Sequence, residues 1–310
     1  GFDGSSYKTA QEYNKSINII TGAAFSSGGN LNTARWSLGQ IGSSVNDAFC
    51  FGGYAQPPSY AVAETYDGTS WSEVSDMNQA RYAMGHSGTT SAALAVGGGS
   101  PNGAINFNNT EEWDGSSWTA TGNYPATGQA RGTAGTQTST LAWAGYENPP
   151  GVNVTTQATY DGSSWTSAGS FPRAVSGQSS TGTSTAAFSA GGGTPKLGTE
   201  EYDGSSWTTG GNMANPRAEA GAMGNSQTEN FQVGWYSPSS PTYRTNVEEY
   251  NGTSFVSSLN LGTGRASLGY KGGSKSAGML IAGGSVGGGP SNAKNNTEEF
   301  TAETTALNVK

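Results

Sequence analysis

The stretch Thr199-Glu200-Glu201-Tyr202-Asp203-Gly204-Ser205-Ser206-Trp207 decides the fold, because near-copies of it recur along the chain. Two short runs of strand-forming residues flank Asp-Gly, a pair that suits a tight turn with positive φ. The pattern predicts a β-hairpin with Tyr202 and Trp207 on neighbouring antiparallel strands. The copies are Tyr66-Asp67-Gly68-Thr69-Ser70-Trp71, Trp113-Asp114-Gly115-Ser116-Ser117-Trp118, Tyr160-Asp161-Gly162-Ser163-Ser164-Trp165 and Tyr250-Asn251-Gly252-Thr253-Ser254-Phe255, followed by a decayed Glu298-Glu299-Phe300-Thr301-Ala302.

Each hairpin belongs to a longer unit that opens on an arginine with a glycine four residues later. A short apolar run ending in glycine follows, for example Ala48 to Gly53 and Leu94 to Gly98. Short strands at this spacing, without helical periodicity between them, are typical of propeller blades. The sequence therefore predicts an all-β, six-bladed β-propeller with four antiparallel strands per blade. The six arginines are Arg35, Arg81, Arg131, Arg173, Arg217 and Arg265.

The predicted propeller covers residues 34–310, and residues 1–33 form an N-terminal extension. This extension holds two weak echoes of the hairpin, at residues 2–7 and 12–17. The last unit already has two candidate hairpin arms, in Asn296 to Phe300 and in Thr304 to Val309. Residues 12–20 are a further candidate for a strand that closes the ring.

Composition excludes several classes of protein. The net charge of -8 gives no positive field that would attract phosphates, so we expect no nucleic-acid partner. No apolar run approaches the roughly 20 residues of a membrane helix, so we expect no membrane insertion. The single cysteine, Cys50, excludes an internal disulfide framework. Five of the eight Trp and four of the 14 Tyr recur at the hairpin positions, which indicates a fold that buries a few large rings per unit.

The arginine opening, the apolar run ending in Gly-Gly and the aromatic pair across a turn together resemble kelch repeats over residues 34–309. The turn is shorter than in the common kelch pattern. The sequence motif Thr-Glu-Glu-Tyr-Asp-Gly-Ser-Ser-Trp-Thr, together with Gly-Thr-Gln-Thr-Ser-Thr at 135–140, is similar to motifs of the kelch-like repeat proteins of marine bacteriophages. The resemblance implies a virion structural or appendage role, such as decoration, tail or fibre, and an extracellular place on the virion surface.

Catalytic chemistry has little support in the sequence. His86 is the only histidine and Cys50 lies in a predicted buried strand, which argues against a catalytic triad or a zinc site. Galactose oxidase chemistry on a kelch-type propeller needs more than one histidine. The paired glutamates, such as Glu111-Glu112 and Glu200-Glu201, all fall in repeat positions. We therefore expect no enzyme activity, no metal and no cofactor.

The repeated charges are interpreted as scaffold. Each arginine can pair with the glutamate two residues before a hairpin aromatic, namely Glu64, Glu111, Glu200, Glu248 or Glu298; in the third unit that position is Ala158. The predicted structural residues are the six arginines, the turn residues Asp67, Asp114, Asp161 and Asp203, and the hairpin tryptophans Trp71, Trp118, Trp165 and Trp207.

What varies between units is the segment after the glycine run, and variable loops on a repeated scaffold are a usual place for recognition. We expect these loops to form one binding face for another virion protein or a host cell-surface glycan. The alternative is a secreted propeller lectin that binds glycans, and a glycosidase is the weakest interpretation. The candidate binding residues are Tyr54, Tyr60, Phe107, Tyr146, Trp235, Tyr236, Tyr243 and Arg244.

Overall fold

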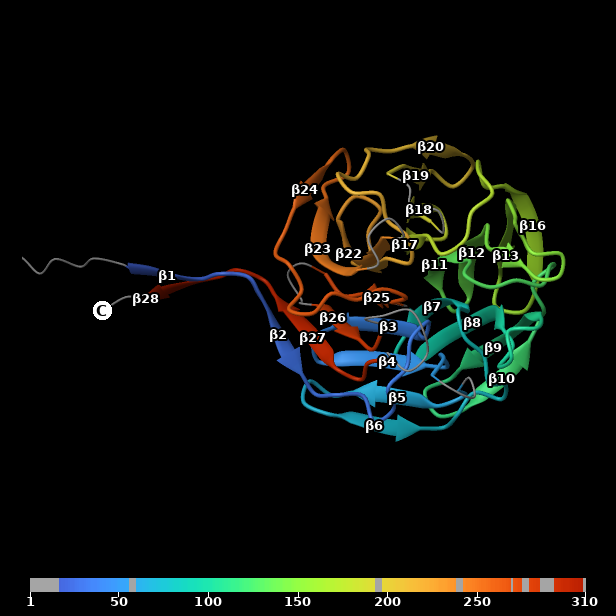
Figure 1. Cartoon of the computed structure of the whole chain (residues 1–310), viewed down its shortest axis with the longest axis horizontal. Coiled ribbons are helices and arrows are strands. Elements are labelled where there is room, and N and C mark those ends of the chain that lie inside the picture. Colours follow the sequence, from blue (N-terminus) through green and yellow to red (C-terminus); the bar gives the residue numbers. More distant parts are fainter. Residues whose placement is uncertain are drawn as a thin grey trace, which may run out of the picture.

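The computed structural model describes residues 17–55, 60–192, 197–237, 242–268, 270–274, 279–284 and 293–308. Its described elements are all β-strands, and they form sheets arranged as a ring around a central axis (Figure 1). The chain is therefore a β-propeller. The two hairpin echoes of the N-terminal extension fall at or before residue 17 and lie almost wholly outside the described residues.

Five sheets contain four antiparallel strands in sequence order, with the first strand nearest the axis (Figure 1). Blade one comprises β3 (Gly39–Ser44), β4 (Asp47–Phe51), β5 (Ala63–Tyr66) and β6 (Trp71–Val74). Blade two comprises β7 (Gly85–Thr89), β8 (Ala92–Gly99), β9 (Asn106–Trp113) and β10 (Trp118–Thr121). Blade three comprises β11 (Gly132–Thr136), β12 (Ser139–Trp143), β15 (Thr156–Tyr160) and β16 (Trp165–Ser170). Blade four comprises β17 (Ser179–Thr183), β18 (Ala186–Ala190), β19 (Thr199–Tyr202) and β20 (Trp207–Thr209), and blade five β21 (Gly221–Met223), β22 (Asn230–Ser237), β23 (Thr242–Tyr250) and β24 (Phe255–Ser257).

The prediction of six four-stranded blades is wrong, because the sixth repeat unit does not form such a sheet. Its first strand, β25 (Tyr270–Gly272), pairs in parallel with β3 of blade one. The strands β26 (Met279–Ala282) and β27 (Thr297–Thr301) form a three-stranded sheet with β2 (Ala24–Gly28). This sheet fills the ring between blades five and one (Figure 1). Among the described residues, the ring thus has six repeat units and five blades of four antiparallel strands.

The hairpin signal explains where the last unit departs from the others. After Phe300 the chain lacks the Asp-Gly or Asn-Gly pair at which the hairpins of the other five units turn. The segment expected to be the outer arm instead forms β28 (Thr304–Asn308), which pairs with β1 (Ile17–Thr21) in a two-stranded ribbon beyond the ring (Figure 1). The outer position is taken by β2, whose Phe25 lies opposite Phe300 with ring centroids 5.2 Å apart. An aromatic pair is therefore kept, with one ring supplied from the start of the chain.

The predicted hairpins are confirmed in the five four-stranded blades. Tyr202 and Trp207 lie opposite each other across the turn, with ring centroids 5.0 Å apart. Gly204 has a φ of 94°, which only glycine adopts readily. The Asp203 Oδ1 accepts hydrogen bonds from the backbone amides of Ser205 and Ser206. These bonds to the charged form, first that from Ser206, lower the pKa of the Asp203 carboxyl.

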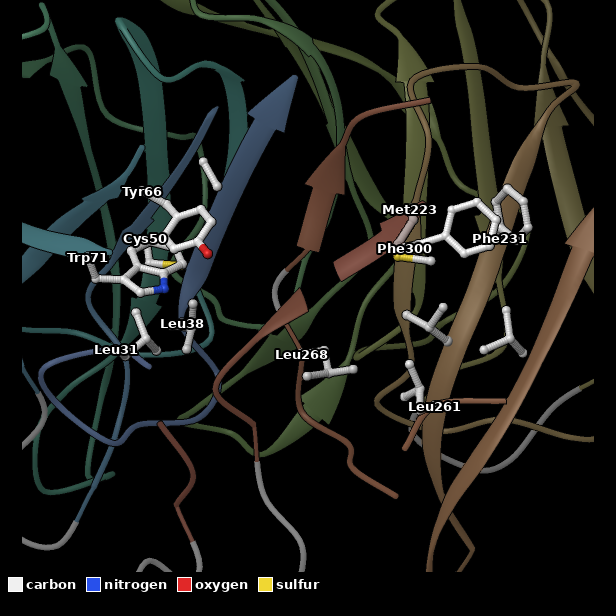
Figure 2. Packing of buried hydrophobic residues seen from close by; sticks show 13 residues of the cluster. Leu31, Leu38, Cys50, Tyr66, Trp71, Met223, Phe231, Leu261, Leu268 and Phe300 are labelled. Atoms are coloured by element: carbon white, nitrogen blue, oxygen red, sulfur yellow. The ribbon is translucent and has the colours of Figure 1, made fainter. Parts of the chain in front are cut away.

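The core lies between neighbouring blades. In blade two, Trp113 and Trp118 pack on Phe49 and Phe51 of blade one, with ring centroids 5.0 to 5.8 Å apart. Figure 2 shows another cluster, in which Leu31 and Leu38 lie near Trp71 while Phe300 lies near Phe231. Large rings at the repeated hairpin positions thus supply much of the packing between blades.

A candidate binding site at the centre of the ring

Most of the repeated arginines form ion pairs with glutamates of the same repeat unit. Five of them lie 2.5 to 3.0 Å from the glutamate expected from the sequence, and the side chains of Arg35, Arg81, Arg217 and Arg265 are fully buried. At Glu248, burial would raise the pKa, but the charge of Arg217 and several hydrogen bonds outweigh it and lower the pKa. Paired, buried guanidiniums of this kind do not form a ring that binds anionic ligands.

Arg131 lacks this partner, because Ala158 stands where the other units have glutamate. Its guanidinium donates to the carbonyls of Ala144 and Thr127 and lies 4.2 Å from the centroid of the Tyr124 ring. Its nearest carboxylate, that of Glu147, is 3.9 Å away. Burial lowers the pKa of Arg131.

A closed circle of backbone hydrogen bonds surrounds the axis. In each unit one amide donates to the carbonyl of the equivalent residue in the preceding unit, at 2.6 to 3.3 Å. All six residues have φ between 50° and 64°, a left-handed conformation that is uncommon outside glycine. We call them the ring residues: Ser37, Ala83, Ala130, Gly177, Glu219 and Ser267. This circle fixes the width of the central opening.

The ring residues line a cavity of about 430 Å³ at one end of the axis. This volume is within the range of about 300–1,000 Å³ that is usual for small-molecule sites. Trp36, Tyr82 and Tyr146 contribute aromatic rings to its wall, together with polar side chains that include Gln129 and Gln178. Two of the lining residues form isolated β-bridges with residues of the variable loops: Trp36 pairs with Tyr54, and Gln129 pairs with Tyr146. The cavity therefore opens on the face that carries the variable loops.

The cavity has two unlike sides. The residues that immediately precede the ring residues are Trp36, Tyr82 and Gln129 in units one to three, but Ser176, Ala218 and Ala266 in units four to six. On the first side Tyr54 joins the rings: its centroid lies 5.2 Å from Trp36 and 5.3 Å from Tyr82. Burial, with a smaller effect from Tyr54, raises the pKa of Tyr82. The aromatic surface is therefore confined to one half of the opening.

Several polar atoms of the cavity wall lack partners among the described residues. They are the indole Nε1 of Trp36 and the amide Oε1 atoms of Gln129 and Gln178. Gln178 is only 7% exposed. An unpaired polar group that is buried in this way is costly unless a ligand or water pairs with it. Amide oxygens and an indole N–H are groups that recognise hydroxyl groups.

The candidate residues from the sequence divide into three groups. Tyr146 lines the cavity and Tyr54 packs against its aromatic wall. Tyr60, Phe107, Tyr243 and Arg244 are partly buried and do not line it. The structure does not describe the side chain of Tyr236.

Trp235, another candidate binding residue from the sequence, is buried. It is 7% exposed, with the guanidinium of Arg244 5.6 Å from its ring centroid. Trp36 and Tyr82 were missed. Each directly follows an arginine that was interpreted as scaffold. The available signal was that the residue after the arginine is aromatic in only two of the six units, which marks it as a variable position.

Catalytic groups are sparse around the cavity. Among the described residues that line the cavity, Glu219 is the only one with a carboxylate, whereas glycoside cleavage uses two. Within the described ranges, no group of three or more His, Cys, Asp or Glu side chains is arranged to hold a metal ion. Across the same residues, no helix is long and apolar enough to cross a membrane.

Comparison with known proteins gives a negative result. No protein-family model matches the chain, and no curated protein matches it. The fold and the cavity define the class, a β-propeller with an asymmetric opening at its centre.

Proposed function

We propose that this chain is a non-enzymatic binding module that recognises one ligand in the central cavity. The observation that carries the proposal is the one-sided aromatic wall formed by Trp36, Tyr54 and Tyr82. A lectin with one site per repeat would place the same rings in several units. Here the equivalent positions of units four to six are small, which favours a single asymmetric site.

The setting we propose is the surface of a phage particle, where the module serves in attachment or particle structure. This proposed setting rests on the resemblance of the repeat motifs to those of kelch-like virion proteins. The geometry is compatible with it, because the ribbon formed by β1 and β28 extends outward from the rim of the ring (Figure 1). A module tethered there would leave the cavity face free to meet a host glycan.

A glycan array tests the proposal with the full chain and two variants. Tyr82→Ala removes a ring from the cavity wall and should reduce binding of the recognised glycan by at least about tenfold, as expected for loss of an aromatic anchor. Val256→Ala changes an exposed apolar residue of β24, 51% exposed, and should leave binding unchanged. Retained binding by Tyr82→Ala, or a stoichiometry of several sugars per chain, would contradict a single central site.

A further inference from the structure

Glu219 is the exception among the ring residues. The other five are serine, alanine or glycine, whereas Glu219 carries a long charged side chain at a φ of 55°. Residues held in this left-handed conformation cluster at functional sites, where surrounding structure enforces an otherwise unfavourable backbone. The side chain is exposed and lines the cavity. Its carboxylate accepts one hydrogen bond, from the Oγ of Ser267, among the described residues.

The circle of hydrogen bonds also fixes where Glu219 stands. It lies three places from Ala83 in either direction around the six ring residues, and is therefore opposite Ala83. Ala83 follows Tyr82, which belongs to the aromatic wall. Glu219 and Ala83 thus lie on opposite sides of the opening, and Glu219, Trp36 and Tyr82 line the same cavity.

The charge of Glu219 has no cationic partner among the described residues, since none of the ion pairs found there includes it. Arg131 is the only arginine among the described residues of the cavity wall, and its guanidinium already donates to carbonyls and lies over the Tyr124 ring. A carboxylate and aromatic rings in one cavity are a combination that suits a cation, because both attract positive charge.

We propose that the cavity takes an amino sugar with a free, protonated amino group, and that Glu219 is the residue that receives this ammonium. The ammonium donates hydrogen bonds to the Glu219 carboxylate, and the apolar face of the sugar packs on Trp36 and Tyr82. The unpaired oxygens of Gln129 and Gln178 accept from its hydroxyl groups. This inference rests on the proposed binding function and specifies its ligand class.

Three monosaccharides distinguish the contribution of the amino group to binding from that of the rest of the sugar: glucosamine, N-acetylglucosamine and glucose. Titration calorimetry with the full chain at neutral pH should give glucosamine at least about tenfold tighter binding than the two neutral sugars, as expected for a charge-assisted hydrogen bond. Glu219→Gln has nearly the same shape and should abolish this preference. Glu73→Gln removes the same charge from an exposed position of β6 and should retain it.

The outcomes distinguish this inference from the function on which it rests. Equal affinity for glucosamine and glucose, or an unchanged preference in a folded Glu219→Gln variant, would overturn the role of Glu219 while leaving a neutral-sugar site. If the variant unfolds, the preference of the wild-type chain should still weaken as rising pH neutralises the amine, and a constant preference would overturn the inference. A glycan array without any hit that depends on Tyr82 would instead remove the proposed function.

Discussion

The two faces of the propeller follow different rules. On one face, Asp67, Asp114, Asp161 and Asp203 make the same turn, with Oδ1 accepting two backbone amides each time. On the other face, the residues before the ring residues change from Trp36 and Tyr82 to Ala218 and Ala266. Uniform residues at equivalent positions indicate a demand of the fold, whereas varied residues on an unchanged backbone indicate freedom for recognition. This contrast is why we place the site in the cavity.

The largest expected effect concerns the packing between blades. Trp118 is 6% exposed and packs on Phe49 and Phe51 of the preceding blade. Trp118→Ala should lower the free energy of unfolding by about 3 to 5 kcal/mol, because it removes a buried ring and leaves a cavity. Urea denaturation followed by circular dichroism measures this loss. A loss below about 1 kcal/mol would show that the repeated ring is not needed by the scaffold.

The second prediction compares two glutamates that face arginines. Glu111 is 1% exposed and lies 2.8 Å from the buried Arg81. Glu111→Gln should cost about 3 to 5 kcal/mol, because it leaves the Arg81 charge buried without its counter-ion. Glu147 is 3.9 Å from Arg131 and partly exposed, so Glu147→Gln should cost less than about 1 kcal/mol.

Denaturation curves of both variants at the same pH make this comparison. Equal losses in the two variants would mean that unit three depends on its carboxylate as the others do, contrary to the hydrogen bonds that Arg131 makes with carbonyls.

A smaller effect is expected at the Asp-Gly turns. Hydrogen bonds, first from the backbone amide of Ser164 and then from the side chain of Ser163, lower the pKa of Asp161 to about 2. The folded pKa is below that of the unfolded chain, so the contribution to stability is present above about pH 4 and is lost as the pH falls toward 2.

Asp161→Asn keeps the acceptor oxygen but not the charge. The difference in melting temperature between wild type and Asp161→Asn should therefore shrink as the pH falls from 5 to about 2, because protonation removes the wild-type charge as well. A difference that stays constant over this range would contradict a role for the carboxylate charge.

The scaffold was predictable because its signals are local and repeated. The Tyr202 and Trp207 pairing follows from one hairpin, and the arginine–glutamate pairs follow from two fixed positions in each unit. The sixth unit was not predictable, because β2 joins β27 from the far end of the sequence. The division at residue 34 stays a prediction.

The cavity was hidden for a different reason. Its ring residues share a backbone conformation but not a single residue type, so no sequence motif identifies them. Counting from the arginines also misaligns the units: Arg35 precedes Ser37 by two residues, whereas Arg131 follows Ala130. Gly128 stands at the place equivalent to Arg35, where a Cβ would collide with the guanidinium of Arg131. Only the three-dimensional structure places these positions on one circle.

The most direct test of the central claim is a binding titration that compares the two faces. A fluorescently labelled glycan selected on the array is titrated into the wild-type chain, Tyr82→Ala and Asp161→Asn. We predict at least about tenfold weaker binding for Tyr82→Ala and unchanged affinity for Asp161→Asn, with both variants folded by circular dichroism. Normal affinity in Tyr82→Ala together with lost binding in Asp161→Asn would contradict the account and place recognition on the face of the Asp-Gly turns.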